Sequence, residues 1–320
     1  MAPDSPRKER KDMTECERIL KERPEFSADF LKEETRCEFF CDTRRKKIWL
    51  VLLDLAMEFD RFCEAHGLTW FLVGGSMLGA ARHRGFIPWD DDIDAGMPCE
   101  DYEKLLALMP EFSEPYEMQA PGKTPGYYFT FARLRNVRTS AINPAFALQG
   151  FNMGLYLDIF PLDEWEPEGA EVYYNRIRDL CVDNSNYMRR SNPYLPERDR
   201  LRAASWSGRD PMDNVREVEA LARQFNGTGA AYWSHAVITL DAFRHNYFHR
   251  ECFDDIVRLP FENITLPVPS GYDRFLTSQY GDWHAFPPVE KRGALHSDEE
   301  MQPDVPYAEA LAAYKKSVGL

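Results

Sequence analysis

The sequence predicts an α/β (α+β) fold, in which a core of helices and strands carries a helical and C-terminal addition. Residues 44–67 repeat apolar side chains at helical spacing and end at a glycine, which is typical of a long core helix. Residues 127–136 and 154–165 are rich in aromatic and branched side chains and predict strands. From 166 to 250 the pattern turns helical, charged and aromatic. With 320 residues and 44% hydrophobic content, the chain can bury a sizeable core.

Shorter elements follow the long helix. The segment LTWFLVGG (68–75) predicts a short buried strand that runs into a glycine pair, and SMLGAARHRG (76–85) predicts a helix with a basic last turn. After Pro88 the chain is expected to be extended as far as Met97, where another helix follows. We therefore expect three parts, which are an N-terminal helical arm (1–43), an α/β core (44–165) and a helical and C-terminal part packed on that core (166–320).

The composition predicts a cytoplasmic protein. A net charge of −14 disfavours non-specific binding to nucleic acid or to an anionic membrane. The chain has no run of about 18 apolar residues, so we expect no integral membrane segment. The charged N-terminus lacks the apolar core of a signal peptide. The seven cysteines lack the spacing of a zinc site, so we expect reduced thiols. We expect no nucleic-acid partner.

Four aspartates crowd into five positions of the segment GFIPWDDDIDAG (85–96). If the chain is extended there, Asp90, Asp92 and Asp94 share one face of a strand and Asp91 points the other way. Carboxylates two positions apart lie roughly 7 Å from each other, and bound divalent cations would offset their repulsion. The segment lacks the glycine and glutamate of a calcium-binding EF-hand loop. A solvated acidic turn is the remaining alternative.

The glycine pair supplies a second half of a possible site. Gly74, Gly75 and Ser76 follow a strand and open a helix, so their backbone N–H groups and the serine hydroxyl can face a phosphate. A phosphate-binding turn and a metal-binding pair of carboxylates are the two parts that phosphoryl-group transfer requires.

The run GGSMLGAARHRGFIPWDDDIDAGMP (74–98) resembles the signature of the LicD family. The resemblance extends over roughly residues 45–296 through four further segments, which are FARLRN (131–136), LDIFPLD (157–163), VPSGYDRFLTSQYGDW (268–283) and PPVEKRGALH (287–296). Relatives of this family include the fukutin-related transferases. Its fold is similar to that of the DNA polymerase β nucleotidyltransferases, with a small mixed sheet flanked by helices.

The resemblance implies a set of site residues. Gly74, Gly75 and Ser76 would form the phosphate-binding turn. Two Mg²⁺ ions, with Mn²⁺ as an alternative, would be held by catalytic carboxylates, which are Asp92, Asp94 and Asp158, with Asp90 as a possible helper. Asp94 or Asp158 would act as general base.

The activity implied is the transfer of a phospho-alcohol group, most typically phosphocholine, from a CDP-linked donor to a sugar hydroxyl. The acceptor would be a glycan or glycolipid of the cell surface, such as a precursor of lipopolysaccharide or teichoic acid. The acceptor would bring a cytoplasmic enzyme to the inner face of the membrane. Attack would fall on the phosphorus that carries the alcohol, and CMP would leave. The sequence does not separate choline from ribitol or another alcohol.

Basic and aromatic residues complete the expected site. Substrate or phosphate contacts are predicted for six residues, which are Arg82, His83, Arg84, Arg133, Arg292 and His296. For each, a role at the surface or at a helix end is the alternative. A choline head group would favour an aromatic cage, for which the candidates are Trp89, Tyr127, Tyr128, Phe129, Trp165, Tyr280 and Trp283.

Two other functions are compatible with the same fold. One is transfer of a nucleotide to a small acceptor, which would release pyrophosphate. The other is a non-catalytic module that binds metal or nucleotide, which the intact Asp92, Asp94 and Asp158 disfavour.

Overall fold

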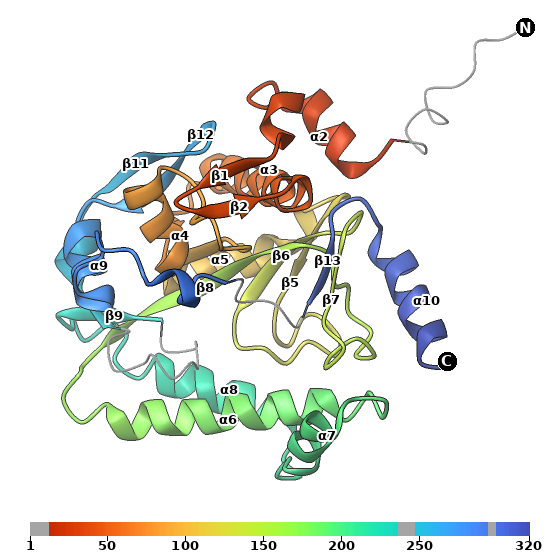
Figure 1. Cartoon of the computed structure of the whole chain (residues 1–320). Coiled ribbons are helices and arrows are strands. Elements are labelled where there is room, and N and C mark those ends of the chain that lie inside the picture. Colours follow the sequence, from red (N-terminus) through yellow and green to blue (C-terminus); the bar gives the residue numbers. More distant parts are fainter. Residues whose placement is uncertain (1–12, 236–246, 294–298) are drawn as a thin grey trace, which may run out of the picture.

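The computed structural model describes residues 13–235, 247–293 and 299–320, and it confirms the predicted α/β fold with a mixed sheet flanked by helices (Figure 1). Within these residues seven strands form the main sheet. Five of them pair in the order β10 (Tyr247–His249), β9 (Tyr232–Ser234), β8 (Tyr156–Trp165), β4 (Asp94–Pro98) and β3 (Phe71–Leu72). The other two are β6 (Ala132–Asn136), which pairs with β8, and β5 (Tyr116–Gln119), which pairs with β6.

The long strand β8 is the centre of the sheet because it pairs with three neighbours. Residues 158–162 run parallel to β4, while residues 156–159 pair antiparallel with β6. Residues 163–165 pair antiparallel with β9. Asp158 and Ile159 therefore pair with β4 on one side and with β6 on the other, and their two side chains point to opposite faces of the sheet. This register determines which side chains meet Asp158.

The predicted long helix is confirmed as α3 (Thr43–His66). It begins where the Asp42 carboxylate accepts a hydrogen bond from the N–H of Arg45, and it ends at Gly67, whose φ of +64° is left-handed. Its buried apolar residues belong to the main hydrophobic core, and the helix packs against β6 and β8.

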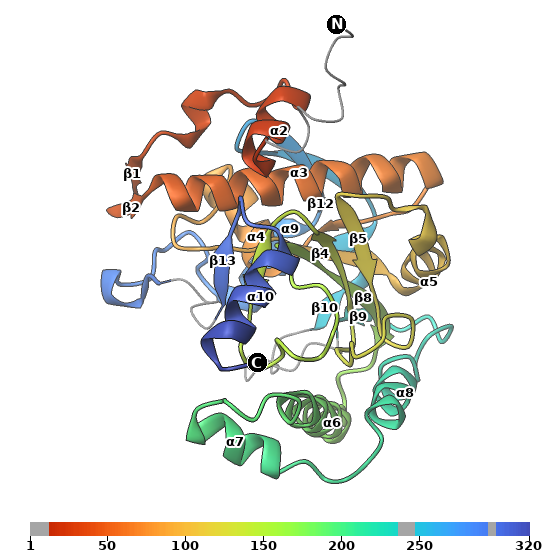
Figure 2. The same ribbon diagram turned by 90° about the vertical axis from the view of Figure 1, so that its right-hand side faces the viewer.

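Three helices form a separate layer, which are α6 (Glu171–Arg189), α7 (Glu197–Ala204) and α8 (Pro211–Ala222). In both Figure 1 and Figure 2 this layer and α3 lie on opposite sides of the strands. The layer has its own apolar cluster around Trp165, Ile177 and Val218. The helical pattern expected as far as residue 250 ends at Ala222, because β9 and β10 follow as strands that extend the sheet.

The remaining elements surround this framework. Those before β8 are α2 (Glu15–Glu22), η1 (Ala28–Leu31), β1 (Glu34–Arg36), β2 (Phe39–Cys41), α4 (Gly74–Leu78), η2 (Gly79–His83), α5 (Cys99–Leu108), η3 (Met109–Glu111) and β7 (Ser140–Ile142). Those near the C-terminus are η5 (Arg250–Phe253), β11 (Ile256–Phe261), β12 (Ile264–Pro269), α9 (Tyr272–Tyr280), η6 (Val289–Lys291), β13 (Glu300–Gln302) and α10 (Tyr307–Ser317).

No helix in the described part of the chain is long and apolar enough to span a membrane. All seven cysteines lie in described residues, and none forms a disulfide.

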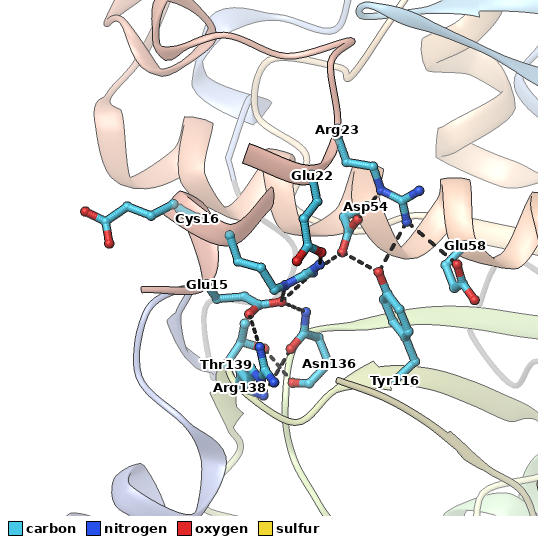
Figure 3. Close-up of polar contacts among 12 residues, drawn as sticks. Glu15, Cys16, Glu22, Arg23, Asp54, Glu58, Tyr116, Asn136, Arg138 and Thr139 are labelled. Atoms are coloured by element: carbon cyan, nitrogen blue, oxygen red, sulfur yellow. Dashed lines mark hydrogen bonds and ion pairs between the residues drawn. The ribbon is translucent and has the colours of Figure 1, made fainter. Parts of the chain in front are cut away.

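A buried ionic network holds α2 on α3 (Figure 3). The carboxylate of Asp54, which is 0% exposed, accepts hydrogen bonds from Arg18 (2.7 Å), Arg23 (2.6 Å) and the hydroxyl of Tyr116 (2.8 Å). Arg18 also donates to Glu15 at 2.7 Å. Burial and the negative charge of Asp54 raise the pKa of Tyr116, so this hydroxyl remains a donor. The network fixes α2 to the core.

Candidate active site

The glycine turn stands against two of the aspartates. Helix α4 begins at Gly74, two residues earlier than predicted, directly after β3 and Val73. Gly74 has a φ of +54°, and a Cβ placed there would lie 3.5 Å from Oδ2 of Asp94. A Cβ at Gly75 would lie 2.9 Å from Oδ2 of Asp90. The missing side chains therefore let these carboxylates approach the turn closely.

Ser76 connects the turn to strand β4. Its buried hydroxyl accepts a hydrogen bond from the N–H of Asp94 at 2.9 Å. The N–H of Val73 donates to the carbonyl of Asp94 at 3.1 Å. These two bonds fix the backbone of Asp94 beside the glycine turn.

The aspartate cluster is not extended throughout. Strand β4 begins only at Asp94, and the preceding aspartates lie in a loop after a turn at residues 88–89. Oxygens of Asp90, Asp91 and Asp92 all lie within 4.8 Å of one another. The expectation that Asp91 points away from the cluster is therefore wrong, because the loop does not have the alternation of a strand. Such a set of carboxylate oxygens suits a hard divalent cation.

The loop is held from α3, by contacts that the sequence analysis did not find. The carbonyl oxygen of Asp90 accepts hydrogen bonds from Nη1 of Arg45 (2.9 Å) and from Nε1 of Trp49 (3.0 Å). Trp49 is 0% exposed and reads in the sequence as an ordinary core residue of the helix. Only the fold brings these two side chains to a loop more than 40 positions away.

Sheet register places Asp158 next to Asp94. Asp94 on β4 pairs with Asp158 on β8, which pairs on its other side with Arg133 on β6. Paired residues project from the same face, so the three side chains form a row across three strands. Arg133 donates to both oxygens of Asp158, from Nε to Oδ1 at 2.5 Å and from Nη2 to Oδ2 at 3.2 Å. Both Asp158 and Arg133, predicted from separate motifs, thus lie in this row.

Arg82 and Arg292, which the sequence also predicts to contact the substrate, bind the protein backbone. Nη1 of Arg82 donates to the carbonyl oxygens of Trp283 (2.8 Å) and Ala285 (2.9 Å), which ties the segment after α9 to the end of η2. Arg292 donates to the carbonyl oxygens of Pro287 and Cys37, both at 2.9 Å.

The remaining predicted contacts fall around the end of η2. Arg84 is exposed, with a left-handed φ of +58°. The ring of His83 packs edge-on against Trp89 and Phe286. Burial, followed by the nearby positive charges of Arg82 and Arg36, lowers the pKa of His83 from 6.5 to about 4. His83 is therefore neutral at pH 7. His296 lies outside the described residues.

Among the aromatic candidates, Tyr280 stands out by its exposure and its neighbours. Tyr127 and Trp165 are 0% exposed and belong to hydrophobic cores. Tyr280, the last residue of α9, is 42% exposed. Desolvation of its hydroxyl, followed by the negative charges of Asp94, Asp90 and Asp92, raises its pKa. Tyr280 is therefore an exposed aromatic residue whose hydroxyl lies within electrostatic range of the aspartates.

The part of the chain that carries this site matches a known family. The model of the nucleotidyltransferase domain of the LicD/FKTN/FKRP family matches residues 67–174, which include the glycine turn, the aspartates and Asp158. Residues 67–174 belong to the LicD family. This LicD-family domain holds α4, β4, β6 and all of β8, and hence the row from Arg133 to Asp94.

Three relatives match this chain to different extents. The chain is 26% identical over 271 residues to the lipopolysaccharide cholinephosphotransferase LicD of Haemophilus influenzae. This match covers 78% of this chain and 95% of that protein. It is 58% identical over 38 residues to the human ribitol 5-phosphate transferase FKRP, but this covers 12% of the chain and 8% of that protein. A protein of Rickettsia prowazekii is 34% identical over 65 residues, 24% of its length.

Proposed function

We propose that this chain is a Mg²⁺-dependent transferase that moves a phospho-alcohol group, with phosphocholine as the first candidate, from a CDP-linked donor to a hydroxyl of a cell-surface glycan or its precursor. The observation that carries the proposal is the glycine turn placed directly against the carboxylates of Asp90 and Asp94. The similarity to a cholinephosphotransferase over 95% of that protein supports the reaction class.

The carboxylates would hold the metal, with Asp92, Asp94 and Asp158 as ligands and Asp90 as a helper. Two Mg²⁺ ions (or Mn²⁺) bound there would neutralise the diphosphate of the donor and lower the pKa of the attacking hydroxyl. The turn at Gly74, whose missing side chain leaves the backbone accessible, would receive the phosphates. Asp90 and Asp94, which border the turn, would then meet the metal and the phosphate at one place.

The transfer would be a single displacement. The acceptor oxygen bonds to the phosphorus that carries the alcohol, and the bond from this phosphorus to the oxygen of CMP breaks. The general base, which takes the proton of the acceptor hydroxyl, would be Asp94 or Asp158. Net charge is conserved, and CMP leaves with the electron pair.

The surroundings of the cluster support a cationic head group over a neutral polyol. Tyr280 is an exposed aromatic residue within electrostatic range of several aspartates, and such an environment attracts a quaternary ammonium. We also propose a cytoplasmic location, since none of the seven cysteines forms a disulfide.

One experiment separates the candidate functions. The full chain is incubated with Mg²⁺, a lipopolysaccharide or lipooligosaccharide acceptor, and CDP-choline, CDP-ribitol or CTP, while CMP and pyrophosphate are measured. We expect CMP release with CDP-choline that depends on the acceptor and disappears in Asp92→Asn and Asp94→Asn. Pyrophosphate release from CTP would establish nucleotidyl transfer instead. Tight binding of nucleotide with no release from any donor would show a binding module.

A further inference from the structure

Arg133 has a different environment from the other basic residues near the site. Its side chain is 11% exposed and that of Asp158 is 9% exposed, and the two form a forked ion pair between neighbouring strands. Three aromatic rings surround the guanidinium carbon, at 4.0 Å for Tyr156, 4.9 Å for Phe129 and 5.3 Å for Phe131, measured to the ring centroids. An arginine held by a fork and by three rings has little freedom to swing toward a substrate.

The pair sits at the edge of the proposed cation site. Asp158 stands beside Asp94 in register, and neighbouring strands are only about 4.8 Å apart. Two carboxylates at this separation repel each other. The fixed positive charge of Arg133 on the far side of Asp158 offsets that repulsion before any cation arrives. The guanidinium of arginine is always protonated in proteins, so this positive charge is permanent.

The hydrogen bonds leave Asp158 able to bind a cation. Each carboxylate oxygen has two lone pairs, and the fork of Arg133 uses one on each oxygen. The second lone pair of each oxygen remains for a metal on the side of Asp94. An arginine in this position resembles the partners that orient metal ligands in many proteins.

We propose that Arg133 is a positioning residue of the cation site, which fixes the carboxylate of Asp158 beside Asp94, rather than a contact of the substrate phosphates. This inference rests on the proposed function, because it takes Asp158 as a metal ligand. It departs from the expectation from sequence, in which Arg133 faced the substrate.

The test measures Mn²⁺ affinity by titration calorimetry on the full chain, without substrate. We expect Arg133→Met to weaken Mn²⁺ binding about 10- to 100-fold. Arg133→Lys should restore part of the affinity, since lysine supplies the charge without the fork. In an Asp158→Asn background, Arg133→Met should cause no further loss.

Arg135 is the matched control. It lies two positions along the same strand, is 2% exposed, and donates to Gln119 at 2.8 Å and to the carbonyl of Gly154 at 2.6 Å. Arg135→Met should lower thermal stability as Arg133→Met does, but change Mn²⁺ affinity less than twofold. A structural role alone would make the two variants alike in both measurements.

The outcomes distinguish the two proposals. If Asp94→Asn abolishes Mn²⁺ binding while a folded Arg133→Met binds within twofold of the wild type, the role of Arg133 is overturned and the proposed function stands. If Asp94→Asn binds Mn²⁺ normally, the proposed function fails, and the inference with it. If Arg133→Met does not fold, Arg133→Lys carries the test. An equal loss in the wild-type and Asp158→Asn backgrounds overturns the inference, and a loss that occurs only while Asp158 is intact supports it.

Discussion

Two regions of this protein bury several carboxylates, and they differ in how charges are arranged. In the network that anchors α2, the acids alternate with arginines, so that Asp54 lies between Arg18 and Arg23. In the loop before β4, oxygens of three consecutive aspartates lie within 4.8 Å of one another, against a turn of glycines.

The difference separates a structural role from a functional one. Alternating charges stabilise each other, so the anchoring network needs no other molecule. Like charges at close range cost free energy, and proteins retain such local costs mainly at functional sites. The glycines add to this contrast, because they leave room beside the carboxylates instead of filling it with side chains.

The largest effect is expected for Asp94→Asn. This substitution removes a proposed metal ligand and a candidate general base, so turnover with CDP-choline should fall on the order of 10³-fold. The free energy of unfolding should stay within about 1 kcal/mol of the wild type, since no charge pair of the anchoring network is touched. CMP release and urea denaturation measure the two effects. Turnover near the wild-type rate would remove Asp94 from the site.

The opposite result is expected for Asp54→Asn. It leaves two buried arginines without their full counter-charge, so the free energy of unfolding should fall by about 3–5 kcal/mol. The folded fraction should keep its turnover. Asp60→Asn is the control. Asp60 lies on the same helix as Asp54 and forms a half-exposed pair with Arg258, so its substitution should cost about 1 kcal/mol or less. Loss of turnover in folded Asp54→Asn would join the two regions functionally.

Several features of the site could be predicted from sequence because they depend on local pattern. The periodicity of α3 and the order of glycine turn and aspartates are of this kind. The loop at the aspartates could not be predicted, because Arg45 and Trp49 hold its backbone from a distant helix. The pairing of Arg133 with Asp158 depends on the register of two strands, which alternation of side chains alone does not determine.

A smaller effect on both stability and function is expected for Gly74→Ala. With φ at +54°, an alanine there is strained by about 1–2 kcal/mol, and its methyl group would lie 3.5 Å from Oδ2 of Asp94. Turnover should fall about tenfold, because the methyl group covers the turn where the phosphates would bind. Gly67→Ala is the matched control, since φ is +64° and no atom lies within 4 Å of the added carbon. It should lose similar stability and keep its turnover.

The smallest effect is expected in the pH dependence of stability, through His83. Burial holds the pKa of His83 at about 4 in the folded protein against 6.5 ordinarily, so between these values the unfolded chain binds a proton that the folded chain does not. Its contribution to stability is therefore fully present above pH 6.5 and is lost progressively as the pH falls toward 4. Between pH 7 and 5, the free energy of unfolding of the wild type should fall by about 1 kcal/mol more than that of His83→Gln. This difference is smaller than a fully buried histidine would give, because solvent screens the partly exposed ring. From pH 7 to 8 the two proteins should change equally, and equal losses between pH 7 and 5 would show that His83 titrates as it does in the unfolded chain.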